Sequence, residues 1–158
     1  MGPILTSLLY IERDGKYLML HRTKKEHDPN EGKWIGVGGK FEADESPEEC
    51  AIREAREETG LSVLRPVFRG IVTFISDRCP TEYMHLFTAA DFTGELRDCD
   101  EGELAWVEKS RVPGLPLWEG DRIFLSLLAE GAPFFSLKLV YRGDTLVRAT
   151  LDGRELAV

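Results

Sequence analysis

Residues 38–61 read GGKFEADESPEECAIREAREETGL and hold the best-marked helix of the chain. Ser46 can cap this helix, Pro47 suits its first position, and Glu49 completes a capping box with Ser46. Gly60 supplies the stop at the other end. The sequence therefore predicts a helix that begins directly after the cap and ends directly before this glycine.

One face of the predicted helix is acidic. Glu54, Glu57 and Glu58 lie at positions i, i+3 and i+4, which brings their carboxylates together. Carboxylates packed this closely repel one another unless a cation screens them, and their oxygen atoms suit Mg²⁺ or Mn²⁺. Arg53 can brace the cluster, and Glu45 can brace Arg53. Taken alone, an E-x-x-E-E pattern also fits a solvated helix with surface ion pairs.

Two glycines and a lysine precede the helix. Gly38 and Gly39 let the backbone bend tightly, so that a carbonyl oxygen can join the ligands of a cation. Lys40 is placed to meet a phosphate. These residues predict that the approach to the helix helps to bind a polyphosphate.

The whole segment resembles the Nudix box, G-x5-E-x7-R-E-U-x-E-E-x-G-U, in which U is apolar. Every required position is filled, by Gly39, Glu45, Arg53, Glu54, Ala55, Glu57, Glu58, Gly60 and Leu61. Ala55 is the weakest of the apolar choices. At usages of roughly 7% per residue type, chance agreement at the seven single-type positions is about one in 10⁸.

The likeness extends beyond the box to MutT/MutX-type 8-oxo-dGTP diphosphatases. It is carried by GKWIGVGGK at 32–40, GIVTF at 70–74 and WEGD at 118–121. The resemblance implies an α+β fold of the Nudix type, an α/β/α sandwich with a mixed sheet and the box helix. It also implies Mg²⁺-dependent hydrolysis of a nucleoside triphosphate to the monophosphate and pyrophosphate, with 8-oxo-dGTP as the expected substrate.

The same resemblance assigns roles to individual residues. It implies a set of metal ligands made of the Gly38 carbonyl, Glu54, Glu57, Glu58 and Glu101. Glu103 competes with Glu101 for the last of these roles, and either Glu57 or Glu101 accepts the proton of the attacking water. Arg22 matches a residue that contacts phosphate, although it also fits an ordinary surface arginine.

Base recognition is expected from the segment after residue 117. By resemblance, Trp118 stacks on a purine and Asp121 hydrogen-bonds to its edge. The alternatives are that Trp118 packs over the core and that Asp121 caps a second helix. Ile35 and Gly120 depart from the residues that read the base in the human member of the family.

Length and charge limit the remaining possibilities. A chain of 158 residues fits a single domain, 1–158. Its net charge of −8 argues against broad binding to duplex nucleic acid or to an anionic membrane. Cys50, Cys79 and Cys99 lack metal-site spacing and are expected to be free thiols in a cytoplasmic protein. The oligomeric state is not readable from the sequence.

Apolar alternation and turn residues predict the other elements. Strands are expected at 4–12, 17–22, 34–39, 63–75, 82–92, 104–107, 134–141 and 145–151, and a second helix at 119–130. A polar loop at 23–33 should separate the second and third strands.

The alternative functions are hydrolysis of another nucleotide (an unmodified triphosphate, a dinucleoside polyphosphate or 5′-triphosphate RNA) and a Nudix binding module without catalysis.

Overall fold

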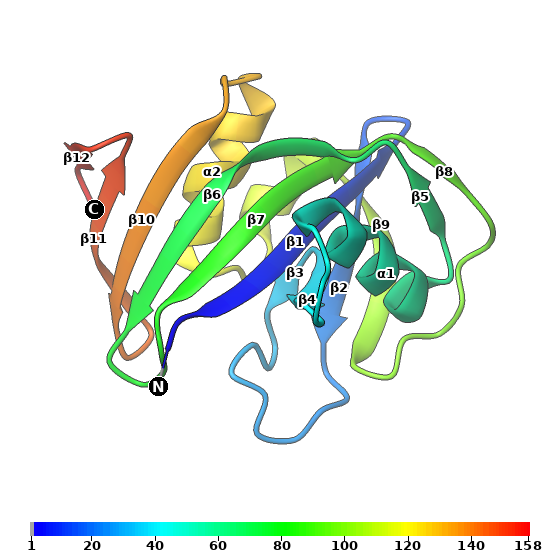
Figure 1. The fold of residues 1–158 in the computed structure, drawn as a ribbon, viewed down its shortest axis with the longest axis horizontal. Helices are drawn as coiled ribbons and strands as arrows, with labels where there is room; N and C mark the ends of the chain where they lie inside the picture. The colour runs from blue at the N-terminus through cyan, green and yellow to red at the C-terminus, as the bar shows by residue number, and fades with distance from the viewer. Residues whose placement is uncertain (1) are drawn as a thin grey trace.

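The computed structural model describes residues 2–158 and consists of a large mixed sheet with an α-helix on each face (Figure 1). The strands of this sheet are β1 (Ile4–Arg13), β2 (Lys16–Arg22), β3 (Trp34–Ile35), β4 (Val37–Lys40), β6 (Val67–Ser76), β7 (Glu82–Ala89), β9 (Gly102–Glu108), β10 (Phe135–Arg142), β11 (Thr145–Leu151) and β12 (Arg154–Leu156). A small separate sheet pairs β5 (Ser62–Leu64) with β8 (Asp91–Thr93).

The strand order of the large sheet is β12-β11-β10-β6-β7-β1-β2-β3, with β4 paired to β1 and β9 paired to β2. The pairs β1–β7 and β10–β6 are parallel, and the other neighbours are antiparallel. Because β1 pairs with β2, β4 and β7, it lies at the centre of the sheet and connects both parts of the molecule.

Helix α1 (Pro47–Thr59) has the termini that the sequence predicts. Ser46 and Glu49 form a complete capping box, and Gly60 ends the helix in the left-handed conformation at φ 83°. The buried side of α1 carries small side chains, including Ala51 and Ala55. They pack against one face of the sheet, in a core cluster with Leu9, Ile11, Leu18, Val37, Leu61, Val63, Phe87 and Ala89.

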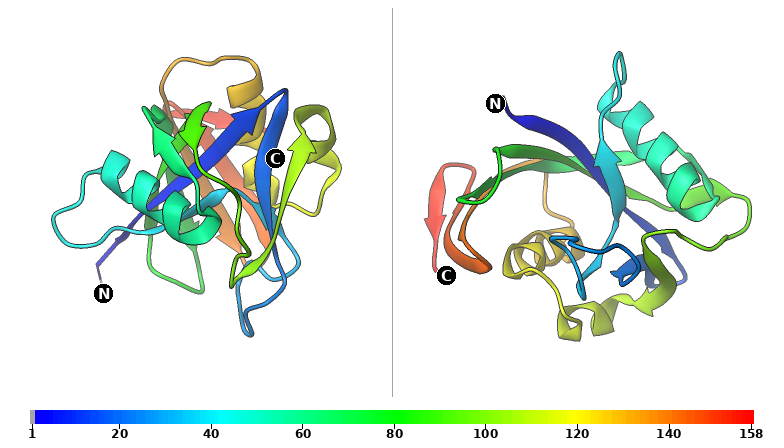
Figure 2. Two further views of the ribbon diagram at one scale, coloured as in Figure 1. Left: turned by 90° about the vertical axis from the view of Figure 1, so that its right-hand side faces the viewer. Right: turned by 90° about the horizontal axis from the view of Figure 1, so that it is seen from below.

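Helix α2 (Glu119–Ala129) lies in the concavity of the opposite face, so that the sheet curves around it (Figure 2). Its first turn packs closely against a side chain of β10: a Cβ atom added at Gly120 would lie 2.4 Å from Leu139 Cδ1. Phe124 and Leu125 continue the contact with the sheet. The arrangement confirms the predicted α+β class and the α/β/α sandwich with a mixed sheet.

Several element boundaries differ from the sequence predictions. The strand expected at 34–39 is divided into β3 and β4, and those expected at 63–75 and 82–92 are each divided in two. Strand β12 and the 3₁₀ helix Lys109–Gly114 were not predicted. Among residues 2–158 no helix is both long and apolar enough to cross a membrane.

Candidate active site

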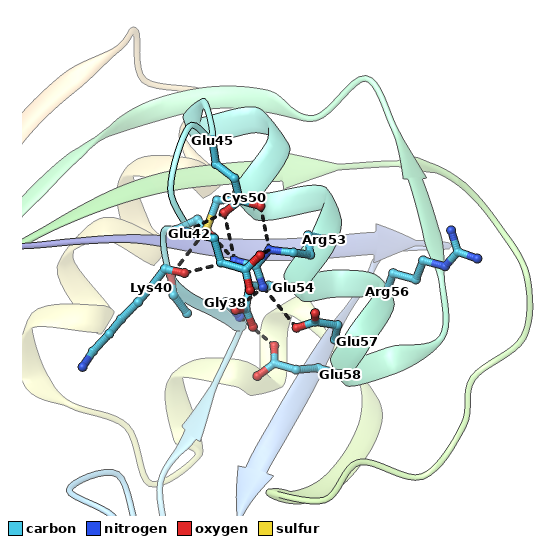
Figure 3. Close-up of polar contacts among 12 residues, drawn as sticks. Gly38, Lys40, Glu42, Glu45, Cys50, Arg53, Glu54, Arg56, Glu57 and Glu58 are labelled. Atoms are coloured by element: carbon cyan, nitrogen blue, oxygen red, sulfur yellow. Dashed lines mark hydrogen bonds and ion pairs between the residues drawn. The ribbon is translucent and has the colours of Figure 1, made fainter.

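The acidic face of α1 turns toward β4, with Arg53 in the middle of its carboxylates (Figure 3). Arg53 Nε lies 2.6 Å from Glu45 Oε2, and Nη1 lies 2.9 Å from Glu54 Oε1 and 3.1 Å from Glu57 Oε2. Nη2 donates to the carbonyl of Lys40 at 3.0 Å. These contacts raise the pKa of Arg53 and lower that of Glu45. The arginine therefore stays charged and holds three of the box glutamates in place.

The two glycines before the helix are required because other groups approach them closely, and not because the backbone bends there. Gly38 and Gly39 lie in strand β4, and neither has a positive φ. A Cβ atom at Gly38 would lie 2.0 Å from the carbonyl oxygen of Ser7, and one at Gly39 would lie 2.7 Å from Cδ of Glu54. The expected tight bend is thus wrong. The glycines allow β1, β4 and the Glu54 carboxylate to come together.

Glu58 is the most constrained of the three helix carboxylates. It accepts a hydrogen bond of 2.8 Å from the backbone N–H of Gly38, which lowers its pKa. Burial has the larger effect and raises the pKa, and the adjacent carboxylate of Glu101 and the charge of Glu54 raise it further. The fold thus brings Glu101, which immediately precedes β9, to the acidic face of α1.

Carboxylate oxygens that crowd together in this way suit a hard divalent cation. Burial raises the pKa of Glu54, and the charges of Glu57 and Glu101 add to the effect. A cation would relieve this repulsion, because oxygen donors are the ligands that Mg²⁺ prefers. Within residues 2–158 no three acidic, His or Cys side chains are already arranged as a ligand set. Arg53 instead occupies oxygens of Glu54 and Glu57.

Arg22 contacts carboxylates in the structure. Its side chain is 10% exposed, and its guanidinium lies 2.7 Å from Asp28 Oδ2 and 3.0 Å from Glu101 Oε2. The interpretation of Arg22 as an ordinary surface arginine is therefore wrong. Asp28 also accepts from the backbone N–H of Asn30 at 3.0 Å, and its side chain is 2% exposed. The sequence analysis missed Asp28, although Asp-Pro-Asn at 28–30 is a common turn composition.

Asp28→Asn tests whether this buried pair holds Arg22 and Glu101 in place. We expect the free energy of unfolding to fall by about 2 kcal/mol, because a buried guanidinium loses a charged hydrogen-bond partner. Chemical denaturation measures the change. Glu26→Gln, in the same loop but exposed, is the matched control and should unfold like the wild type. Equal stability of both variants would show that Asp28 has no supporting role.

The loop that carries Asp28 also contacts the predicted base-stacking residue. Trp118 Nε1 donates to Asn30 Oδ1 at 2.8 Å, and Lys33 Nζ lies 4.9 Å from the indole centroid. The indole meets Tyr141 edge-on, with the ring centroids 5.4 Å apart. Trp118 therefore packs beside the core and is held in one orientation by the loop.

Asp121 is buried and does not cap α2. The N-cap position of the helix is Trp118, and no side chain makes a capping bond there. Burial and the charge of Glu82 raise the pKa of Asp121 to about 7, against the opposing effect of Arg122. The helix-capping alternative for Asp121 is therefore wrong, and its carboxylate faces the interior between α2 and the sheet.

The remaining candidates lie farther from the carboxylates. Lys40 is exposed, and its side chain extends away from the box glutamates (Figure 3). Glu103 is exposed and pairs with His21 in the sheet. Ile35 pairs with Leu20. Of the two competing acidic residues, only Glu101 is placed against Glu58 by the described contacts.

Fold and site together define the Nudix class: a helix with braced carboxylates lies on one face of a mixed sheet, and a second helix lies on the other. The NUDIX domain matches residues 4–128, and the chain belongs to the Nudix hydrolase family. It is 34% identical to the uncharacterized Nudix hydrolase YvcI of Bacillus subtilis over 126 residues, which cover 77% of this chain and 76% of the relative.

Two further comparisons extend over nearly the whole chain. The oxidized purine nucleoside triphosphate hydrolase of Danio rerio is 30% identical over 152 residues, which cover 94% of each protein. The crystal structure of a MutT protein from Bacillus halodurans superposes with a TM-score of 0.85 at 28% identity, covering 94% of this chain and 97% of that one.

Proposed function

We propose that this Nudix hydrolase cleaves a nucleoside triphosphate to the monophosphate and pyrophosphate, with Mg²⁺ as cofactor and 8-oxo-dGTP as the preferred substrate. The observation that carries the proposal is the acidic face of α1, where Arg53 lies between Glu54 and Glu57 and where Glu58 is buried beside Glu101. The similarity to an oxidized purine nucleoside triphosphate hydrolase supports the choice of substrate.

The acidic residues bind the cofactor and handle the proton. Mg²⁺, which Mn²⁺ can replace, neutralises phosphate charge and lowers the pKa of a water molecule when it is bound. Glu54, Glu57, Glu58, Glu101 and the carbonyl of Gly38 are the proposed ligands. Glu57 and Glu101 are the two candidates for the general base, and each is paired with an arginine, Arg53 and Arg22 respectively. Arg22 and Lys40 are the proposed phosphate contacts, and Arg22 can reach a phosphate only by sharing its guanidinium with Asp28 and Glu101.

The base is proposed to stack on Trp118 and to bind Asp121. Oxidation of guanine at C8 adds a carbonyl and turns N7 from an acceptor into a donor. An acceptor of the site that faces N7 then gains a hydrogen bond from the damaged base, whereas the normal base presents a second acceptor to it. Unpaired polar groups in a buried site are costly, so this difference can support strong discrimination.

Comparison of kcat/KM for 8-oxo-dGTP and dGTP tests the substrate. We expect 8-oxo-dGTP to be preferred, and Asp121→Ala to lower its kcat/KM by at least about 10-fold more than that of a pyrimidine triphosphate. Trp118→Ala should weaken all purines through lost stacking. Asp144→Ala, an exposed aspartate far from α2 in the sequence, is the control. Equal rates for the two guanine nucleotides would contradict the damaged-base assignment.

One observation favours a different nucleotide as the substrate of this Nudix hydrolase. Gly120 leaves no room for a side chain, because Leu139 and the hydroxyl of Tyr141 occupy that space. Asp121 is therefore the one acidic residue proposed to read the base within the first turn of α2. A single residue of this kind also fits an enzyme that accepts several bases or prefers another one. A panel of unmodified triphosphates, dinucleoside polyphosphates and 5′-triphosphate RNA distinguishes these substrates. Release of no product from any of them would favour a binding module.

A further inference from the structure

A second carboxylate, Glu82, occupies the same concave face of the sheet as α2. Alternation along β7 places Glu82 on the side of Met84 and Leu86, which belong to the core cluster beneath α2. Glu82 Oε2 accepts a hydrogen bond of 2.7 Å from the hydroxyl of Thr6, which is itself 7% exposed. Thr6 therefore fixes the carboxylate of Glu82 at the edge of this face.

Asp121 approaches the same region from α2 and lacks a partner of its own. The residue is 7% exposed, and within residues 2–158 its carboxylate receives no hydrogen bond and no ion pair that meets ordinary distance limits. The neighbouring Arg122 is engaged by the carbonyls of Leu115 and Leu117 and by Glu119. Its carboxylate is therefore free to accept a hydrogen bond from a ligand.

A third polar group in this region is also unsatisfied. The hydroxyl of Tyr10 is buried and has no hydrogen-bond partner among the described residues. Burial is the main cause of the raised pKa of Tyr10 and of Asp121; the charge of Asp121 adds to the first and the charge of Glu82 to the second. Asp121 thus lies within electrostatic reach of both Tyr10 and Glu82.

Aromatic rings extend along the face between the two carboxylates. Phe74 is the cross-strand partner of Glu82, and its ring centroid lies 5.0 Å from that of Tyr141. Tyr141 in turn contacts Trp118, and its hydroxyl accepts from the N–H of Gly120 at the start of α2. Phe74 and Trp118 are only partly buried, and aromatic surface with acceptor groups beside it suits a flat heterocycle that carries N–H donors.

We propose that Glu82, oriented by Thr6, is a specificity-determining residue that acts with Asp121 to accept hydrogen bonds from the N1–H and 2-amino groups of a guanine-type base. The inference rests on the proposed function, because it names the base edge that the same enzyme selects.

The donor pattern of the bases explains the choice of guanine. Guanine presents two adjacent donors, N1–H and the 2-amino group, which can donate to the carboxylate oxygens of two acidic side chains. Adenine and cytosine place a ring acceptor beside their amino group, and thymine flanks N3–H with two carbonyls. These edges would place a lone pair opposite a carboxylate oxygen, and two acceptors that face each other without a proton between them weaken binding.

Product binding in EDTA tests the inference without metal or turnover. Isothermal titration compares dGMP with dIMP, which lacks only the 2-amino group. We expect the wild type to bind dGMP at least about 10-fold more tightly than dIMP, and Glu82→Gln to reduce this ratio to about 2-fold or less. Glu130→Gln, an exposed glutamate beyond the end of α2, is the control and should keep the wild-type ratio.

Glu82→Asp separates the carboxylate from the fold. It keeps the carboxylate but shortens the side chain by one methylene. The ratio of the affinities for dGMP and dIMP should therefore lie between those of the wild type and Glu82→Gln. Thermal unfolding should be unchanged within a few degrees in both variants. An equal ratio in the wild type and Glu82→Gln, or no preference in the wild type, would overturn the inference. Absence of nucleotide hydrolysis with Mg²⁺ would overturn the proposed function instead.

Discussion

In excess EDTA, hydrolysis of every nucleotide substrate should fall to the background rate, and added Mg²⁺ or Mn²⁺ should restore it. Burial raises the pKa of both Glu54 and Glu58, and the charge of Glu101 adds to the effect, so an unscreened site repels a polyphosphate. The loss should exceed about 10³-fold, because both substrate binding and activation of the water depend on the cation. Release of pyrophosphate at fixed ionic strength measures it.

Thermal unfolding provides the control for this experiment. A cation that binds only the folded state raises the midpoint of unfolding, and the rise grows with the logarithm of the cation concentration, whether or not substrate is present. The chelated protein should therefore unfold at a lower temperature but remain folded at the assay temperature. Full turnover in chelator, with the protein intact, would contradict the metal-dependent mechanism.

Glu58→Gln should lower kcat by at least about 10²-fold, the usual scale for a group that stabilises charge or handles a proton. The amide oxygen can still accept from the N–H of Gly38, so the local structure is preserved. Replacing the buried charge also removes its repulsion with Glu101. The variant should therefore unfold at the same temperature as the wild type or at a higher one.

Two companion variants make the result specific. Glu57→Gln should also lower kcat at least about 10²-fold if this glutamate binds the metal, although its side chain is 57% exposed. Glu48→Gln removes a carboxylate from the exposed first turn of the same helix and should leave kcat unchanged. A near-normal rate for Glu58→Gln would support the solvated acidic helix, which is the alternative explanation of the pattern.

Local signals account for the elements that the sequence predicted well. The ends of α1 follow from Ser46, Glu49 and Gly60, whose effects act within one helical turn. The loop after β2 and the hairpin of β10 and β11 follow from turn residues between apolar runs. The predicted strand boundaries were wrong where the pairing partner decides them. At Gly36 the chain stops pairing with β2 and begins to pair with β1.

The sequence by itself determined the family, the box helix and the carboxylates on its face, because spacing along a helix is set by the backbone alone. Only the tertiary structure decided which distant groups meet them. It paired Arg22 with Asp28 and Glu101, joined Asn30 to Trp118, and brought Thr6 to Glu82 across the parallel pair of β1 and β7. Such contacts depend on strand register and sheet curvature, which are settled by the packing of the whole core rather than by neighbours in the chain.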